Sequence, residues 1–442
     1  MKFGIICIVF ITVCSLAGPA IALNLLVHPD GSGEYGTIEG AISAAVDGDT
    51  VMLTDGVYTG RGNTNLLFLG KKILLFSQSG NPDACIIDVA GEANEIAERG
   101  ITFDHNEDSL SILKDITIIH GSADAPCPGC EGAGLYVVLS SPTIINVTCR
   151  DNYAANGAGI MIAGGSPKIT NCRFVNNAAF EGAGFMCLDS AAATMSKCLI
   201  SGNQSDMRGG GVSIQSYCNL TMINCTISNN ISPTGGGIAA WESNYNISNS
   251  IISFNGGGAS VFAYGASQIA ISHSDVFGNA GGDWVDSIGW QQGINGNISA
   301  NPLYADTSND DFRLTQNSPC INTGDPNSPH DPDGTITDMG AYYFSQTGTE
   351  GDLAPLPLWE IRNYPNPFNA QTTIAYSLQN SGLVRIDIYD LLGRKLQALV
   401  NEEQSAGYHQ VVWDANNAPS GLYFYRMSAD GRTEAKNMLL LK

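Results

Sequence analysis

A glycine motif that repeats along the middle of this 442-residue chain constrains its fold more than any other feature. The motif occurs five times, at intervals of 25, 25, 27 and 26 residues, as Gly132-Ala133-Gly134, Gly157-Ala158-Gly159, Gly182-Ala183-Gly184, Gly209-Gly210-Gly211 and Gly235-Gly236-Gly237. The stretches between these turns are too short for helices and alternate with the period of strands. Because one such repeat cannot bury its apolar side chains alone, we expect the repeats to stack as the coils of a parallel β-helix.

A second motif keeps the same spacing and is followed each time, five residues later, by an asparagine. Its members are Asn146-Val147, Asn171-Cys172, Lys197-Cys198, Asn224-Cys225 and Asn249-Ser250, followed by Asn152, Asn177, Asn203, Asn230 and Asn255. Stacked coils place equivalent residues about 4.8 Å apart, so the five later asparagines are predicted to form a structural hydrogen-bonded ladder. Cys172, Cys198 and Cys225 are predicted to stack inside as reduced thiols, because three in line cannot all pair.

The domain organisation follows from where the repeat begins and ends. Residues 37–46 have helical spacing and are predicted to cap the first coil, so that the β-helix with its closing segment occupies residues 23–346. Residues 347–362 are predicted to be a linker. Six alternating stretches in residues 363–442 predict a small β-sandwich with a core of Tyr389, Trp413, Tyr423 and Tyr425. The predicted fold class is therefore all-β.

The formal charge of −22, from 20 Lys and Arg against 42 Asp and Glu, is unevenly placed. Residues 363–442 hold seven basic and seven acidic residues, so the whole of the negative charge lies upstream of them. This difference supports a domain boundary near residue 360. The chain has no basic face of the kind that phosphate binding needs, so nucleic acid is not an expected partner, and we expect a monomer.

Residues 1–22 are predicted to be a secretory signal peptide, with Lys2, an apolar run over residues 5–16 and the cleavage pattern Ala20-Ile21-Ala22. The apolar run is too short to span a bilayer. Export permits disulfides without requiring them. Cys127-Pro128-Gly129-Cys130 has no second cysteine pair at zinc spacing, so a short disulfide-closed turn is favoured over a metal or redox site.

The last 80 residues contain a series of short motifs. They begin with Asn363, Tyr364, Pro365, Asn366, Pro367, Phe368 and Asn369, and continue through Ile388–Arg394, Ala406–His409, Val412–Asp414, Ser420–Tyr425 and Met438–Lys442. In these motifs the segment resembles the type A sorting domain of substrates of the bacterial type IX secretion system. The resemblance implies that the type IX secretion machinery is a partner and that the protein reaches the cell surface or the extracellular space. In that family the domain has no catalytic role and is commonly cleaved or exchanged for an anchor; the sequence leaves this open.

Residues 23–346 contain recognisable motifs at both ends. Those at the start are Pro29–Tyr35, Thr37-Ile38, Ala41-Ile42, Gly48–Val51 and Gly56–Tyr58. Those at the end are Asn301–Tyr304, Phe312–Leu314, Ser318–Ile321 and Asp338–Tyr342. With these motifs the domain resembles the pectin-lyase-like superfamily, which implies a right-handed parallel β-helix. Both sets correspond to structural segments of the family, so they indicate fold and not activity.

Catalytic groups are sparse. A lyase needs a basic side chain beside a uronate, yet no Lys or Arg occurs between Arg208 and Arg313. A hydrolase needs clustered carboxylates, and Asp189, Asp206, Glu242 and Asp275 do not form a stacked set. A methylesterase needs further Gln, Asp and Arg motifs that the sequence lacks.

Two sets of residues remain as candidate binding sites. Asp325, Asp331, Asp333 and Asp338, with a turn at Gly334, offer oxygen ligands suited to calcium, although a solvated acidic loop has the same composition. Tyr217, Trp241 and Tyr245 are candidate glycan platforms, although each could pack on a neighbouring coil. The favoured function is a non-catalytic glycan- or surface-binding module; the alternative is a lyase, esterase or hydrolase of acidic polysaccharides.

Overall fold

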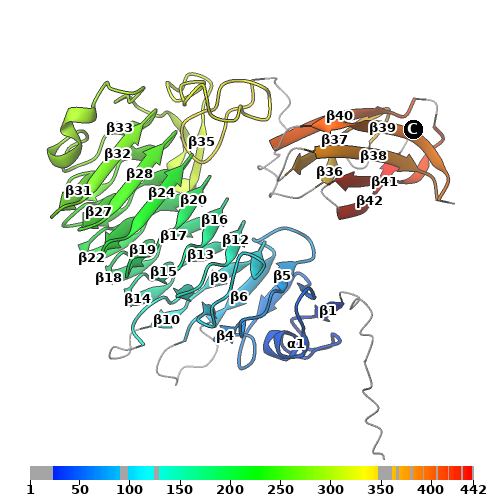
Figure 1. The fold of residues 1–442 in the computed structure, drawn as a ribbon, viewed down its shortest axis with the longest axis horizontal. Helices are drawn as coiled ribbons and strands as arrows, with labels where there is room; N and C mark the ends of the chain where they lie inside the picture. The colour runs from blue at the N-terminus through cyan, green and yellow to red at the C-terminus, as the bar shows by residue number, and fades with distance from the viewer. Residues whose placement is uncertain are drawn as a thin grey trace, which may run out of the picture.

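The computed structural model describes residues 23–89, 98–123, 129–346, 361–364, 368–378, 382–391, 393–404, 407–416, 418–429 and 432–440. Within them the chain forms a right-handed parallel β-helix and a small antiparallel sandwich, as predicted (Figure 1). The predicted signal peptide and most of the predicted linker lie outside the described residues. No helix in the described part of the chain is long and apolar enough to cross a membrane.

Four parallel sheets form the faces of the β-helix, and each coil adds at most one strand to a sheet. Sheet A contains β1 (Asn24–Val27), β2 (Thr50–Leu53), β5 (Leu74–Ser77), β8 (Ile112–Lys114), β12 (Thr143–Ile145), β16 (Lys168–Thr170), β20 (Thr194–Ser196), β24 (Asn219–Ile223), β28 (Asn244–Ser248) and β32 (Gln268–Ser272). Sheet B contains β3 (Gly56–Tyr58), β6 (Cys85–Asp88), β9 (Thr117–Ile119), β13 (Thr148–Arg150), β17 (Arg173–Val175), β21 (Leu199–Ser201), β25 (Thr226–Ser228), β29 (Ile251–Ser253) and β33 (Asp275–Phe277).

The other two sheets follow the glycine motif and the asparagine ladder. Sheet C contains β4 (Leu66–Leu67), β7 (Ile101–Phe103), β11 (Leu135–Val138), β15 (Ile160–Ala163), β19 (Phe185–Leu188), β23 (Val212–Gln215), β27 (Ile238–Trp241) and β31 (Val261–Tyr264). Sheet D contains β10 (Ser122–Ala123), β14 (Tyr153–Asn156), β18 (Ala178–Glu181), β22 (Gln204–Arg208), β26 (Ile231–Ser232) and β30 (Gly256–Gly257). Inward side chains of all coils form one continuous apolar core.

The predicted asparagine ladder is confirmed and runs one coil further, to Asn279. In each step an asparagine donates from its backbone N–H and its side-chain amide to Oδ1 of the next; between Asn177 and Asn203 these distances are 2.9 and 3.0 Å. The earlier motif has a different role: its first residue adopts a left-handed conformation, with φ of 51° at Asn146 and 53° at Lys197, where sheet A turns into sheet B.

The glycine motif places backbone where a side chain would not fit. Gly182 has φ of +60°, which favours glycine, and a Cβ on Gly184 would lie 2.7 Å from the carbonyl oxygen of Gly211 on the next coil. Close stacking at this corner therefore requires the repeated glycines.

Both ends of the β-helix are covered. The predicted cap helix is confirmed as α1 (Ile38–Ala44), with Thr37 as its N-cap and Ile38, Ala41 and Ile42 buried. At the other end lies the short helix η2 (Asp286–Gln291), and Trp284 and Ile288 join the core. These contacts cover strand edges that would otherwise be open to pairing.

Residues 298–346, here called the closing segment, fold back along the outside of sheet B. The segment contains β34 (Tyr304–Asp306), η3 (Thr307–Asn309) and β35 (Asp311–Leu314). Phe312 packs with Val175 and Leu199 of sheet B. The backbone of the closing segment also forms hydrogen bonds to the coils: the Gly340 N–H donates to the Asn249 carbonyl at 2.8 Å.

The sandwich contains the six predicted strands and one more. One sheet comprises β36 (Ile361–Tyr364), β37 (Gln371–Leu378) and β40 (Gly407–Asp414); the other comprises β38 (Gly382–Tyr389), β39 (Lys395–Gln404), β41 (Gly421–Ala429) and β42 (Arg432–Leu440). Trp413, Tyr423 and Tyr425 lie in the core as predicted. The prediction for Tyr389 is wrong: it lies outside the core cluster at the partly exposed end of β38, and its hydroxyl accepts a hydrogen bond from Arg426.

Eight of the described cysteines, seven in the coils and one in the closing segment, are free and buried. They are Cys85, Cys149, Cys172, Cys187, Cys198, Cys218, Cys225 and Cys320. This confirms reduced thiols at Cys172, Cys198 and Cys225. Cys130 is disulfide-bonded, and Cys127 of the CxxC motif lies outside the described residues.

Candidate functional sites

Three side chains from successive coils stack at the end of sheet C. The rings of Trp241 and Tyr264 are stacked with their centroids 4.0 Å apart, and the Arg208 guanidinium lies 5.0 Å from the centroid of the Trp241 ring. Arg208 comes from the coil before Trp241 and Tyr264 from the coil after it, so they cover opposite faces of the indole. The ring with an open face is therefore that of Tyr264, which is 54% exposed.

Arg208 is held in place by a partly buried carboxylate. Its Nε donates to Glu181 Oε1 at 2.8 Å, and Gln215 Nε2 donates to Glu181 Oε2 at 2.6 Å. Glu181 is only 8% exposed, and both of its oxygens have partners. This network fixes the cation that covers one face of Trp241, and so fixes the stack.

The predicted glycan platforms separate in the structure. Tyr217 is 68% exposed in the turn after β23, where its N–H donates to the carbonyl of Glu242, the residue after Trp241. Tyr245 is 1% exposed and lies in the core, so its prediction as a surface platform is wrong. Tyr264, which the sequence analysis did not single out, takes its place. Tyr217, Trp241 and Tyr264 are here called the aromatic corner.

The four predicted calcium ligands lie in the closing segment, where backbone amides occupy several of their oxygens. Asp338 accepts from the N–H of Asn322 at 2.7 Å and of Phe344 at 2.6 Å, and Asp331 accepts from the N–H of Asp338 at 2.7 Å. Burial raises the pKa of Asp331 to about 7 and that of Asp338 to about 6. Neutral carboxyl groups are weaker ligands than carboxylates.

Asp325 and Asp333 have more open positions in the same segment. Asp325 accepts from Asn327, and Asp333 accepts from Thr335 and Gln346. The described residues contain no group of three or more His, Cys, Asp and Glu side chains placed to hold a metal. Calcium binding by these four residues stays a prediction from the sequence.

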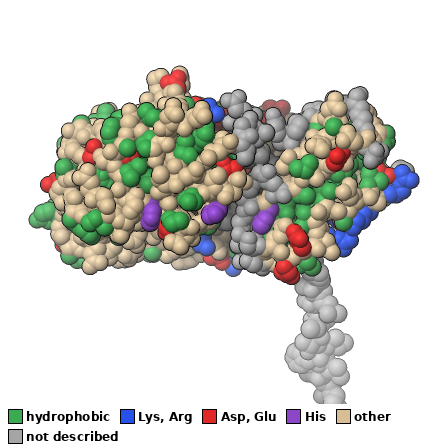
Figure 2. Space-filling view, turned by 90° about the horizontal axis from the view of Figure 1, so that it is seen from above, with side chains coloured by type: hydrophobic (Ala, Val, Ile, Leu, Met, Phe, Trp, Pro, Cys, Tyr) green, Lys and Arg blue, Asp and Glu red, His purple; other side chains and the backbone are tan. Residues whose placement is uncertain are grey.

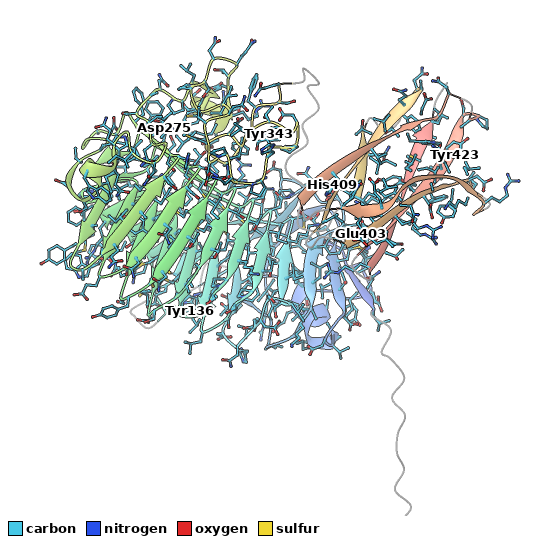
Figure 3. The ribbon with its side chains drawn as sticks, turned by 45° about the horizontal axis from the view of Figure 1, so that its top comes forward. Tyr136, Asp275, Tyr343, Glu403, His409 and Tyr423 are labelled. Atoms are coloured by element: carbon cyan, nitrogen blue, oxygen red, sulfur yellow. The ribbon has the colours of Figure 1, made fainter. Side chains whose placement is uncertain are left out.

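Asp275, one of the four acidic residues considered above for hydrolysis, is fully buried. Figure 3 shows it in the part of the β-helix next to the closing segment. Its carboxylate accepts from the Ala300 N–H at 2.9 Å and from the Cys320 thiol at 3.6 Å, and burial raises its pKa to about 7. The carboxyl group of Asp275 is fully buried, so it contacts the closing segment and is not accessible to a substrate.

The sorting motif starts within β36, the first strand of the sandwich, and continues beyond it. Asn363 Nδ2 donates to Thr372 Oγ1 at 3.0 Å, and the Phe368 ring packs on Trp413 with centroids 5.6 Å apart. The Phe368 N–H donates to the Leu439 carbonyl, so the motif also ties down the last strand. Pro365, Asn366 and Pro367 lie outside the described residues.

Family models match both domains of the chain. Residues 133–297 match a right-handed β-helix region, and residues 362–440 match a secretion system C-terminal sorting domain. The chain is a β-helix protein with a type IX sorting domain. A search of curated proteins finds no match to it.

For this β-helix protein the sorting domain settles the destination. It indicates export to the cell surface or the extracellular space and handling by the type IX secretion machinery. Lys and Arg side chains are conspicuous on the sandwich in Figure 2, whereas the β-helix face seen there is mostly uncharged. The sorting domain says nothing about what the β-helix binds, so that function depends on the β-helix surface itself.

Proposed function

We propose that the β-helix is a non-catalytic module that binds glycan at the cell surface or in the extracellular space. The observation that carries the proposal is the aromatic corner, where the exposed Tyr264 ring is held against Trp241 and, through it, against Arg208. Sugar rings bind to aromatic faces that are fixed before the ligand arrives, because little conformational entropy is then lost.

The alternative, cleavage of an acidic polysaccharide, finds less support. Arg208 is the one basic group described at the aromatic corner, and its guanidinium is engaged by Glu181 and the Trp241 ring. Asp206 is exposed on sheet D and Glu242 in a turn, whereas Asp275 is covered. These groups do not form the open acid–base pair that hydrolysis uses.

Binding to a panel of polysaccharides by the purified exported protein tests the proposal. We expect Tyr264→Ala to weaken binding to the retained glycans by at least about fivefold, as the loss of one aromatic contact would. Tyr153→Ala is the matched control, because Tyr153 is 48% exposed on sheet D, away from the corner. Binding to no glycan, or equal loss with both variants, would overturn the proposal. Release of reducing ends, unsaturated uronides or methanol would establish the enzymatic alternative.

A further inference from the structure

The outer face of sheet A beside the aromatic corner is free of charged side chains. Strands β24, β28 and β32 lie side by side there (Figure 1), and their outward residues alternate with residues that face the core. The nine outward residues, here called the amide face, are Asn219, Thr221, Ile223, Asn244, Asn246, Ser248, Gln268, Ala270 and Ser272.

These side chains form a regular array because the strands pair in exact register. Asn219, Asn244 and Gln268 make one row across the strands, and Thr221, Asn246 and Ala270 make the next. Neighbouring members are about 4.8 Å apart across strands and about 6.6 Å apart along a strand. Asn244 Nδ2 donates to Asn219 Oδ1 at 3.2 Å, which orients both amides.

Part of this hydrogen-bonding capacity is unused by the protein. Among the described residues, no hydrogen bond is made by the side chains of Thr221, Asn246 and Gln268. Asn246 and Gln268 are exposed, and each amide offers two donors and an acceptor. A repeating ligand could therefore use equivalent groups on successive strands.

The amide face and the aromatic corner are continuous. Each strand of the amide face begins only two to four residues after an aromatic side chain: Asn219 follows Tyr217, Asn244 follows Trp241 and Gln268 follows Tyr264. The aromatic rings therefore lie along one edge of a surface that consists mainly of amide and hydroxyl groups. This combination suits a ligand with apolar ring faces and many hydroxyl groups.

The charge of the protein indicates whether the ligand is acidic or uncharged. The turns that lead into these three strands contain one charged residue, the exposed Glu242, and residues 209–312 contain no Lys or Arg. A polyanion would be repelled by Glu242 and by the net charge of −22, and would meet no cation on the amide face. An uncharged polymer meets neither penalty.

We infer that the amide face and the aromatic corner together bind an uncharged polysaccharide. Tyr264 stacks on a sugar ring, while Thr221, Asn246 and Gln268 bond the hydroxyl groups of the chain as it crosses sheet A. The inference rests on the glycan binding proposed above and names its ligand class and its surface.

Affinity electrophoresis of the purified exported protein in gels containing hydroxyethyl cellulose, mixed-linkage β-glucan or mannan, against polygalacturonate and alginate, tests the inference. We expect retention by at least one neutral polymer. Thr221→Val and Gln268→Glu should each weaken it about three- to tenfold, the worth of one net hydrogen bond. Gln204→Glu is the matched control, because Gln204 is an exposed glutamine on sheet D, and it should leave retention unchanged. Thermal melting of each variant verifies that it is folded.

The outcomes separate the two proposals. Two outcomes would overturn binding at the amide face and leave the proposed glycan binding intact. One is retention by acidic polymers alone. The other is full retention of the Thr221→Val and Gln268→Glu variants when the Tyr264→Ala variant is no longer retained. Equal losses in Gln204→Glu and Gln268→Glu would also overturn it. Retention by no polymer of either class would overturn the proposed function itself.

Discussion

Asn203 is bonded twice to Asn230 on the next coil: its backbone N–H donates to Asn230 Oδ1 at 3.0 Å and its side-chain amide donates to the same oxygen at 2.8 Å. The Asn203 amide also donates to the Phe174 carbonyl at 2.9 Å, and its own oxygen accepts from Asn177. Both residues are fully buried. One side chain therefore satisfies polar groups on the coil before its own and on the coil after it.

We expect Asn203→Ala to lower the free energy of unfolding by about 3 kcal/mol or more. The substitution leaves the Asn177 N–H, the Phe174 carbonyl and Asn230 Oδ1 short of partners, and each buried unpaired group costs about 1–3 kcal/mol. Urea denaturation measures the change. Gln204→Ala, at the exposed neighbouring position, should change stability by less than about 0.5 kcal/mol. Similar values for the two variants would contradict a structural role for the ladder.

The ladder was predictable because its spacing is local and repeated, whereas other sites depended on side-chain direction. In β28 the alternation places Asn244 and Asn246 outward and Tyr245 inward with Ile247, a signal the sequence contains but that a search for aromatics overlooks. Tyr264 is harder to recognise because the position of the glycine motif before its strand is occupied by Gly258-Ala259-Ser260. Only the register with Trp241 identifies it.

The burial of Asp275 could not be predicted from its own strand. It pairs with Ile251 in sheet B at an outward position, where an aspartate would ordinarily be solvated. The closing segment covers it, and that contact joins residues 45 apart in the chain, Asp275 and Cys320. Short-range periodicity carries no information about such contacts.

Arg208→Met should destabilise the β-helix by about 1–3 kcal/mol, because it leaves the Glu181 carboxylate, whose side chain is 10% exposed, without its cation. Arg208→Lys should recover part of this loss, since it restores the charge without the planar group that covers Trp241. Arg150→Met is the control, because its ion pair with Asp151 is well exposed and worth less than about 1 kcal/mol. Urea denaturation of the three variants measures the changes in the free energy of unfolding. Equal losses of stability in Arg208→Met and Arg150→Met would argue against a stabilising role for the network around Glu181.

The eight buried free thiols should not react with Ellman's reagent while the protein is folded. Burial raises the pKa of the Cys198 and Cys225 thiols well above their usual range, so the reactive thiolate is scarce as well as inaccessible. All eight should react after addition of guanidinium. Ser166→Cys, at an exposed turn position, supplies a positive control that should react at once in the native state. Rapid reaction of several thiols in the unmodified native protein would contradict this packing.

The stability of the closing segment should fall as pH rises from about 4 to about 7. Asp275 has a pKa of about 7 when folded and an ordinary value of 3.8 when exposed, so between these values the folded state holds a proton that the unfolded state has lost. Its contribution is therefore complete below pH 4 and is lost as pH rises through 7, by up to about 1.4 kcal/mol per pH unit. Hydrogen exchange of residues 298–346 between pH 5 and pH 8, corrected for intrinsic rates, measures it. Asp275→Asn keeps one oxygen to accept from the Ala300 N–H, places an amide NH2 group beside Cys320 Sγ in place of the second oxygen, and cannot ionise. It should therefore reduce this pH dependence and slow exchange at pH 8. Asp306→Asn is the control: hydrogen bonds from Ser308 and Asn309 lower the pKa of this exposed carboxyl, so its effect should be constant over the same range. An unchanged pH dependence in Asp275→Asn would show that Asp275 does not couple the closing segment to pH.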